Sequence, residues 1–318
     1  MSTSGIYSFA VSRDDIIRQA MLNIKRLDPD ESPTSQETTD CSRVLNMMCK
    51  QWMGKNDFAP GLKTWTRRRG TMFLNGTTGR YTVGPSATGW AVDPSITTST
   101  VAAAGGASAV VVASATGFAG TYALGIELTN NTIFWTTVSS VVGTTVNLSS
   151  PLPSGMSSGA LVTAYQAAAQ NPVHIESAFL RDNDMSDTPL TIMQQLTYDA
   201  LPNKADPTNI GDPTAIYWER GLTTSQVYTD VGASQDVSKY IIITYLEPVQ
   251  DFVSSTDNPY YPQEWYLALC WGLSEQICPM FKANWDQKME QLKNSAIAIA
   301  RQGQPEVSEM YFQPGNDQ

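Results

Sequence analysis

One segment, residues 251–282, constrains the fold of this chain more than any other. Pro259 and Pro262 come first, and proline suits a first helical turn because its missing N–H would have no partner there. Glu264 then places a carboxylate near the positive end of the helix dipole. The residues that follow leave little room for a solvated face: Trp265, Leu267, Leu269, Trp271, Leu273 and Ile277. Such a helix is usually buried on more than one side, in a deep core or at a subunit interface.

The two ends of the chain also have helical periodicity. Ser12 is a good N-cap for a first helix, and Thr34 or Ser35 can cap a second one that runs to about Lys55. Two helices joined by a short loop predict an antiparallel hairpin. A last helix is expected from about residue 283 to 302. Its apolar residues share one face: Trp285, Met289, Leu292, Ala296 and Ile299.

Between these helices the sequence is typical of strands. Alternation and β-branched residues predict strands at residues 64–67, 71–74, 80–83, 173–181, 215–219, 225–229 and 239–246. Residues 97–165 differ from the rest, because they are rich in Thr, Ser, Val, Gly and Ala and carry a single charge, Glu127. Short β runs separated by turns predict a small inserted barrel or sandwich. Five aromatic residues would supply its core: Phe118, Tyr122, Phe134, Trp135 and Tyr165.

The expected fold class is therefore α+β. The N-terminal helix hairpin and two C-terminal helices would form a helical layer, joined to a small β-structure that carries the all-β insert. We expect residues 1–96 and 166–302 to form the body and residues 97–165 the inserted domain. Residues 303–318 would be an extended tail with one apolar cluster, Met310, Tyr311 and Phe312.

Composition excludes several classes of partner. The formal net charge is −10 and only 16% of residues are charged, so nothing drives the whole chain to coat DNA. No run is long and apolar enough to span a membrane, and the N-terminus lacks a secretion signal. Both cysteine pairs, Cys41 with Cys49 and Cys270 with Cys278, lie eight residues apart in predicted helices. That spacing excludes a disulfide within either pair, so we expect buried thiols.

Residues that could carry catalysis are few. His174 is the only histidine, and it lies in a predicted strand without a nucleophile motif nearby. Residues 104–107 lack the Lys-Ser/Thr that a phosphate loop needs, and no metal-ligand spacing is present. The densest cluster of basic residues is Arg67, Arg68 and Arg69. It would contact DNA or an acidic partner, or else form a solvated face with intramolecular ion pairs. We expect no enzyme activity, cofactor or metal.

Residues 257–273 carry a resemblance. Asp-Asn-Pro-x-Tyr-Pro-Gln-Glu-Trp-x-x-Ala-Leu-x-Trp-x-Leu, with Pro279 one turn later, resembles the C-terminal signature of the head-to-tail adaptor proteins of short-tailed bacteriophages. These proteins are also called tail accessory factors or packaged-DNA stabilisation proteins. The segments Leu-Pro-Asn-Lys at 201–204, Pro-Thr-Ala-Ile-Tyr-Trp at 213–218 and Ile-Thr-Tyr-Leu-Glu-Pro at 243–248 agree in order and spacing.

This resemblance implies a structural virion protein at the head-to-tail junction, made in the host cytoplasm. Its copies would form a ring, typically dodecameric, under the portal and would extend the DNA channel, help retain packaged DNA and support nozzle and fibre proteins. DNA would pass through without sequence-specific binding. Asp257, Pro262, Glu264 and Trp265 would form the helix-start motif. Met310, Tyr311 and Phe312 would dock on the portal or a neighbour, or pack on their own domain.

Two points stay open from the sequence. Trp265, Trp271 and Trp285 could form the helix core or lie at a subunit interface, where aromatic residues are enriched. The chain could instead be a receptor- or carbohydrate-binding tail component that uses the β insert, which predicts exposed aromatic residues on that insert. A cell-wall hydrolase would need a carboxylate pair in a cleft. The insert cannot supply one, because Glu127 is its only charge, so a host-domain pair such as Asp182 and Asp184 would have to serve.

Overall fold

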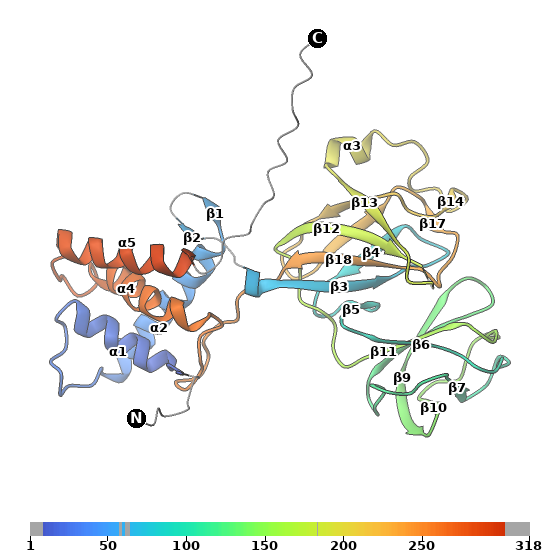
Figure 1. Ribbon diagram of the computed structural model, residues 1–318, viewed down its shortest axis with the longest axis horizontal. Helices are drawn as coiled ribbons and strands as arrows, with labels where there is room; N and C mark the ends of the chain where they lie inside the picture. Colours follow the sequence, from blue (N-terminus) through green and yellow to red (C-terminus); the bar gives the residue numbers. More distant parts are fainter. Residues whose placement is uncertain (1–8, 57–58, 61–63, 183, 303–318) are drawn as a thin grey trace, which may run out of the picture. The chain divides into compact units, whose positions relative to one another are not determined.

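The computed structural model describes residues 9–56, 59–60, 64–182 and 184–302, and it is a mixed α+β protein with several sheets (Figure 1). The chain divides into two units. Met1–Thr66 and Val249–Gln318 make up the helical unit, and Arg67–Pro248 make up the β unit. The boundaries expected near residues 96 and 166 lie inside the β unit, so the host strands group with the insert and not with the helices.

Four helices make up most of the helical unit: α1 (Arg13–Asn23), α2 (Ser35–Trp52), α4 (Tyr266–Ile277) and α5 (Gln287–Gln302). It also contains two short 3-10 helices, η1 (Thr64–Thr66) and η2 (Gln263–Trp265), and the two-residue strands β1 (Lys55–Asn56) and β2 (Ala59–Pro60). Ser12 caps α1, as predicted, and Thr34, one of the two predicted candidates, caps α2. Each forms a capping box with an acidic residue three positions along the chain. Residues 64–66 form η1 where a strand was expected.

Helix α4 lies at the centre of this unit and packs against α1, α2 and α5 (Figure 1). The core that these helices share is built from apolar side chains such as Ile16, Leu45, Trp265, Leu269 and Leu273, each 0% exposed. All four cysteines are buried and free, which confirms the expectation of buried thiols.

Both C-terminal helices differ from their sequence predictions in one respect. Leu267 on α4 is 57% exposed, so this helix does have one solvated side. Helix α5 begins at Gln287, four residues after the expected start, and buries Ala296 and Ala300. The expected stripe was wrong in part, because Leu292 and Ile299 are 42% and 60% exposed. Small side chains at a helix contact permit a close approach of the two axes, which favours the alanine face.

The β unit contains an eight-stranded sheet in the order β4-β16-β15-β13-β12-β18-β3-β5. Neighbouring strands in this sheet are antiparallel, except for β13 and β15, which are parallel to each other. One face buries a core to which every strand contributes, including Trp90, Ile216, Val227 and Ile241. The strands are β3 (Arg67–Phe73), β4 (Arg80–Val83), β5 (Trp90–Val92), β12 (His174–Arg181), β13 (Asp187–Met193), β15 (Ala215–Glu219), β16 (Ser225–Thr229) and β18 (Tyr240–Leu246). Helix α3 (Gln195–Asp199) and the strand pair β14 (Ile210–Gly211) and β17 (Ala233–Ser234) lie in its connections.

The remaining strands form a second sheet, in the order β6-β11-β8-β9-β10-β7. A bridge between Ser99 and Val112 joins its two edges, so the sheet nearly closes into a barrel. Apolar side chains such as Leu124, Ile126, Val146 and Val162 fill its interior. The strands are β6 (Ser95–Thr98), β7 (Ala109–Val111), β8 (Ala123–Glu127), β9 (Ile133–Val142), β10 (Thr145–Leu148) and β11 (Leu161–Tyr165).

The barrel is joined to the larger sheet by an apolar cluster within the β unit. Phe73 of β3 and Tyr240 and Ile242 of β18 pack with Ile133 and Leu161 of the barrel. The chain enters the barrel directly from β5 and leaves it before β12 (Figure 1). The joint between the two sheets is therefore a packed contact and not only a pair of connecting segments.

Candidate functional site

Asp257 organises the loop that precedes the helix-start motif. Its Oδ2 accepts the backbone N–H groups of Val253 at 2.7 Å and Ser254 at 2.6 Å. These two hydrogen bonds, from Ser254 first and Val253 second, hold the pKa of the Asp257 carboxyl below its usual value. The backbone carbonyl of Asp257 accepts the N–H of Arg13 at 2.8 Å, at the start of α1. The motif, which lies near the C-terminal end of the chain, thus holds the beginning of α1 near the N-terminal end.

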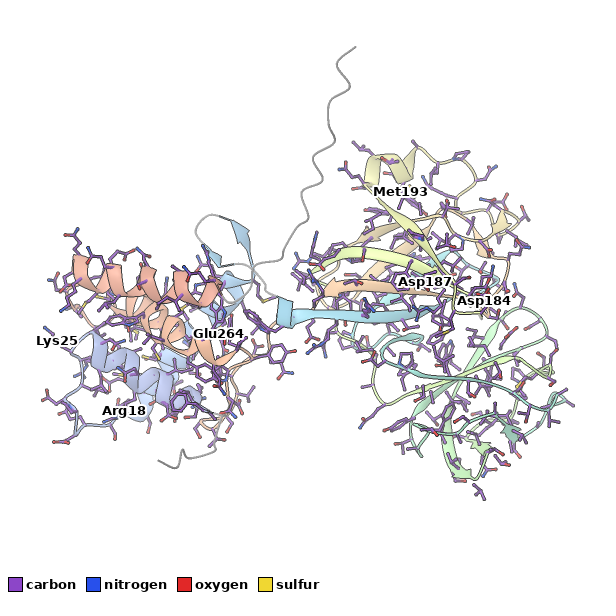
Figure 2. The ribbon with its side chains drawn as sticks, viewed as in Figure 1. Arg18, Lys25, Asp184, Asp187, Met193 and Glu264 are labelled. Atoms are coloured by element: carbon purple, nitrogen blue, oxygen red, sulfur yellow. The ribbon has the colours of Figure 1, made fainter. Side chains whose placement is uncertain are left out.

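Pro262, Glu264 and Trp265 lie at the transition into α4. Pro262 occupies the N-cap position of η2, one residue before the first turn, and its carbonyl accepts the N–H of Trp265 at 2.9 Å. Glu264 is exposed beside the start of α4 (Figure 2), where a carboxylate interacts favourably with the helix dipole. The polar part of the motif therefore starts the helix, while its tryptophan points into the core.

Trp265 is the centre of an aromatic cluster and is 0% exposed. Its ring centroid lies 6.1 Å from that of Trp52, 5.6 Å from that of Trp65 and 5.9 Å from that of Tyr261. The indole N–H of Trp65 donates to the carbonyl of Tyr260 at 3.0 Å. Aromatic pairs at these separations stabilise a fold beyond the area they bury. Trp265 is therefore a core residue of the helical unit.

Trp271 and Trp285 have a different environment, because both are half-buried. Their rings meet edge to face at 6.4 Å, and the indole N–H of Trp285 donates to Oε2 of Glu290 at 2.9 Å. Hydrogen bonds from Lys293 and from Trp285 lower the pKa of Glu290. Leu267, four residues before Trp271 on α4, is exposed. This part of α4 presents an apolar surface that the described residues of the helical unit do not fully cover.

A second apolar surface lies on α5. Leu292 and Ile299 are seven residues apart, so they share one face, and both are exposed. Between them the same side of the helix presents Ser295, which is uncharged. Helical periodicity groups these residues correctly but does not tell which face of the helix the rest of the protein covers.

The arginine cluster lies on β3 and is largely paired within the β unit. Nε and Nη2 of Arg67 donate to the carboxylate of Glu176 at 2.6 and 3.2 Å. Nε of Arg68 lies 3.0 Å from Oε1 of Glu247. Arg69 is exposed. The alternative of intramolecular ion pairs thus accounts for two of the three charges, and contact with DNA or a partner stays a prediction.

The residues that could carry catalysis are separated, because His174 begins β12 while Asp182 and Asp184 follow its end, and both aspartates have other partners. His174 is exposed at the beginning of β12. Oδ2 of Asp182 lies 3.1 Å from Nζ of Lys239. Oδ1 of Asp184, a residue labelled in Figure 2, accepts the N–H of Ser186 at 2.8 Å. Hydrogen bonds from Ser186 lower the pKa of Asp184. A general acid needs a raised pKa, and that of Asp184 is shifted in the opposite direction.

The predicted docking cluster of the tail is not tested by the structure. Met310, Tyr311 and Phe312 lie outside the described residues. Within the described part, no group of three or more His, Cys, Asp and Glu side chains could hold a metal ion. No helix in that part is long and apolar enough to cross a membrane.

The aromatic residues of the barrel do not form an exposed cluster. Phe118 and Tyr165 are buried, and Tyr122, Phe134 and Trp135 are half-buried. The expectation that a receptor-binding insert would expose a group of aromatic side chains is therefore not met on the barrel. Trp135 instead faces the joint with the larger sheet, where its ring lies 5.7 Å from that of Phe73.

No protein-family model matches this chain, and no curated protein matches it. A function for the chain is therefore inferred from the contacts described above and from the motif at residues 257–273.

Proposed function

We propose that this chain is a structural virion protein that forms an adaptor ring between the portal and the tail of a short-tailed bacteriophage. The observation that carries the proposal concerns the motif on which the family resemblance chiefly depends. Asp257 binds the start of α1, and Trp265 fills the centre of the helical core. A signature motif whose residues stabilise the fold is typical of a protein that functions by assembling with other proteins. The proposal includes no catalytic step, cofactor or metal.

In this proposal α1, α2, α4 and α5 form one helical layer, and that layer makes the contacts between copies. The exposed apolar side chains Leu267, Leu292 and Ile299 support such contacts, because exposed apolar surface favours association. A closed ring needs a heterologous interface, in which two different faces of the same unit meet. We assign one of these faces to α5 and propose a dodecameric ring that matches the symmetry of the portal.

The net charge of −10 supports a conduit. An acidic wall repels the phosphate backbone, so DNA would pass through the ring without being held by sequence. The ring would extend the channel, help retain packaged DNA and support nozzle and fibre proteins.

Residues 303–318, with Met310, Tyr311 and Phe312, would dock on the portal, where burial of apolar surface would offset the lost entropy of the segment. In the proposal the protein is made in the host cytoplasm and ends in the virion.

The role of α5 is tested by gel filtration with light scattering, using the purified chain mixed with portal rings. The wild-type chain should elute with the portal. Ile299→Asp places a charge on the exposed α5 face and should prevent assembly without unfolding the chain, since this side chain is 60% exposed. Gln276→Asp, at an exposed position of α4, adds the same charge as a control and should assemble normally. Assembly of the Ile299→Asp variant at wild-type level would exclude α5 as the contact surface.

A further inference from the structure

Three cavities follow one another along the joint between the barrel and the larger sheet, all within the β unit. Their volumes are about 410, 470 and 420 Å³. Residues 86–88 and Trp135 line both the first and the second cavity. Residues 165–167 line both the second and the third. Neighbouring cavities share lining residues, so they are adjacent, and each has the size of an ordinary small-ligand pocket.

The aromatic walls of this series are held in place. The Trp135 ring lies 5.7 Å from that of Phe73 and 5.8 Å from that of Tyr165. A Cβ added at Gly125 would lie 2.6 Å from the indole, so the ring packs directly on this backbone. The hydroxyl of Tyr165 accepts the N–H of Gly89 at 2.9 Å. A site whose aromatic side chains are already fixed loses little conformational entropy when it binds a ligand.

The polar groups of the cavities are almost all uncharged. Hydroxyl and amide side chains line the second cavity, among them Thr88, Thr121, Thr137 and Gln166, and none of its lining residues is charged. The first cavity is lined by one charged residue, Arg80, and the third by one, Asp93. Binding of a phosphate polymer requires several Lys or Arg side chains, which this lining does not contain. Hydroxyl and amide groups both donate and accept hydrogen bonds, as sugar hydroxyls do.

We infer that this joint binds a neutral oligosaccharide, one or two sugar residues to each cavity. The apolar C–H face of a sugar would pack on those parts of Trp135 and Tyr122 that are exposed, since both residues are half-buried, and its hydroxyls would bond to the threonine and glutamine side chains. An aromatic body beside polar groups suits a ligand with one apolar face and a polar rim. The site does not depend on the adaptor proposal, since it lies wholly in the β unit and uses no contact between copies.

The inference is tested on the full chain with four neutral hexasaccharides, built from α-glucose, β-glucose, mannose and N-acetylglucosamine. A heparin hexasaccharide, a thymidine oligonucleotide and an uncharged peptide serve as comparators. Saturation-transfer NMR detects binding at millimolar concentration, and calorimetry then gives the affinity. Ala167→Trp fills the wall shared by the second and third cavities. Gln166→Ala removes one polar group from the same wall, and Gln170→Ala is its matched control, since Gln170 is exposed but lines none of the three cavities.

We expect at least one neutral hexasaccharide to bind better than every comparator. Ala167→Trp should abolish this binding, Gln166→Ala should weaken it about fivefold, as expected for one lost hydrogen bond, and Gln170→Ala should leave it unchanged. Both cavity positions are exposed, so thermal unfolding of each variant should match that of the wild type. The inference is overturned if none of the four saccharides binds, if the peptide or a charged probe binds as well as they do, or if a folded Ala167→Trp variant binds as the wild type does.

Discussion

The backbone N–H of Arg13 donates to the carbonyl oxygen of Asp257 at 2.8 Å, which ties the first residue of α1 to the loop before α4. The first N–H groups of a helix have no partner within the helix itself. Here the partner comes from a segment that the whole β unit separates from α1 in sequence. The helical unit therefore depends on the loop that Asp257 holds together.

Replacement of Asp257 by Asn should destabilise the helical unit in a pH-dependent way. The carboxylate accepts two backbone hydrogen bonds, and these lower its pKa in the folded state. A lowered pKa contributes stability above the pKa of the unfolded chain, and this contribution is lost as the pH falls through the folded value. The wild type should therefore melt at a higher temperature than Asp257→Asn at pH 7, and the difference should shrink below about pH 4.

Asp30→Asn serves as the control, because Asp30 is exposed in the loop between α1 and α2. Its melting temperature should follow that of the wild type across the same pH range. A difference between the wild type and Asp257→Asn that stays constant from pH 7 to about pH 3 would mean that the charge of Asp257 does not stabilise the loop.

Trp265 and Trp271 should differ in their effect on stability although they lie on neighbouring turns. Trp265→Ala removes a fully buried ring from the aromatic cluster and should cost about 3–5 kcal/mol. Trp271→Ala removes a half-buried ring and should cost roughly 1–2 kcal/mol. Urea unfolding followed by circular dichroism at helical wavelengths measures both. A larger loss for Trp271→Ala would contradict the assignment of Trp265 to the core.

The parts of this fold that could be predicted from the sequence are local. The N-caps Ser12 and Thr34 each bond to a residue three positions along the chain, and a turn of two residues joins β9 to β10 in the barrel. The pairing of β3 with β18 involves strands far apart in the chain, and no short-range pattern specifies it. The boundary between the units, at Thr66 and Arg67, also depends on which distant strands pair. Composition alone therefore could not locate it.

The surfaces were harder to predict than the elements. On α5 the periodicity groups Leu292 with Ala296 and Ile299, but the core takes the smaller alanine and leaves the two larger side chains exposed. The cavities beside Trp135 form only when the barrel packs on the larger sheet, and residues 86–88 and 165–167 then approach one another. A sequence pattern within one element does not predict which distant segments come into contact.

The four thiols should be unreactive in the native protein. Burial raises the pKa of Cys41 to about 11 and the pKa values of Cys49 and Cys270 to about 12, and it also raises the pKa of Cys278. The thiolate is the reactive form, so almost none is present at pH 8. A disulfide reagent such as DTNB should react slowly with the folded chain and should titrate four thiols in guanidinium chloride. A thiol that reacts within seconds in the native protein would contradict the burial of the helical core.

The β unit should fold without the helical unit. It is one continuous stretch, Arg67–Pro248, with its own two cores. Its first strand pairs with its last, since Arg67 lies opposite Leu246, so both ends lie on neighbouring strands. A polypeptide of residues 67–248 should give a β-type circular dichroism spectrum, dispersed amide NMR signals and a cooperative melt. A spectrum without dispersion would show that the helices are needed for this unit to fold.

The adaptor proposal is tested most directly by mass photometry of the full chain mixed with portal rings, beside a chain that ends at residue 302. The full chain should raise the mass of the portal particle by whole multiples of 34.7 kDa, up to a complete ring, and the shortened chain should fail to do so. A full chain that leaves the portal mass unchanged at every mixing ratio would contradict the proposal. Equal binding by the shortened chain would keep the ring and remove the docking role of Met310, Tyr311 and Phe312.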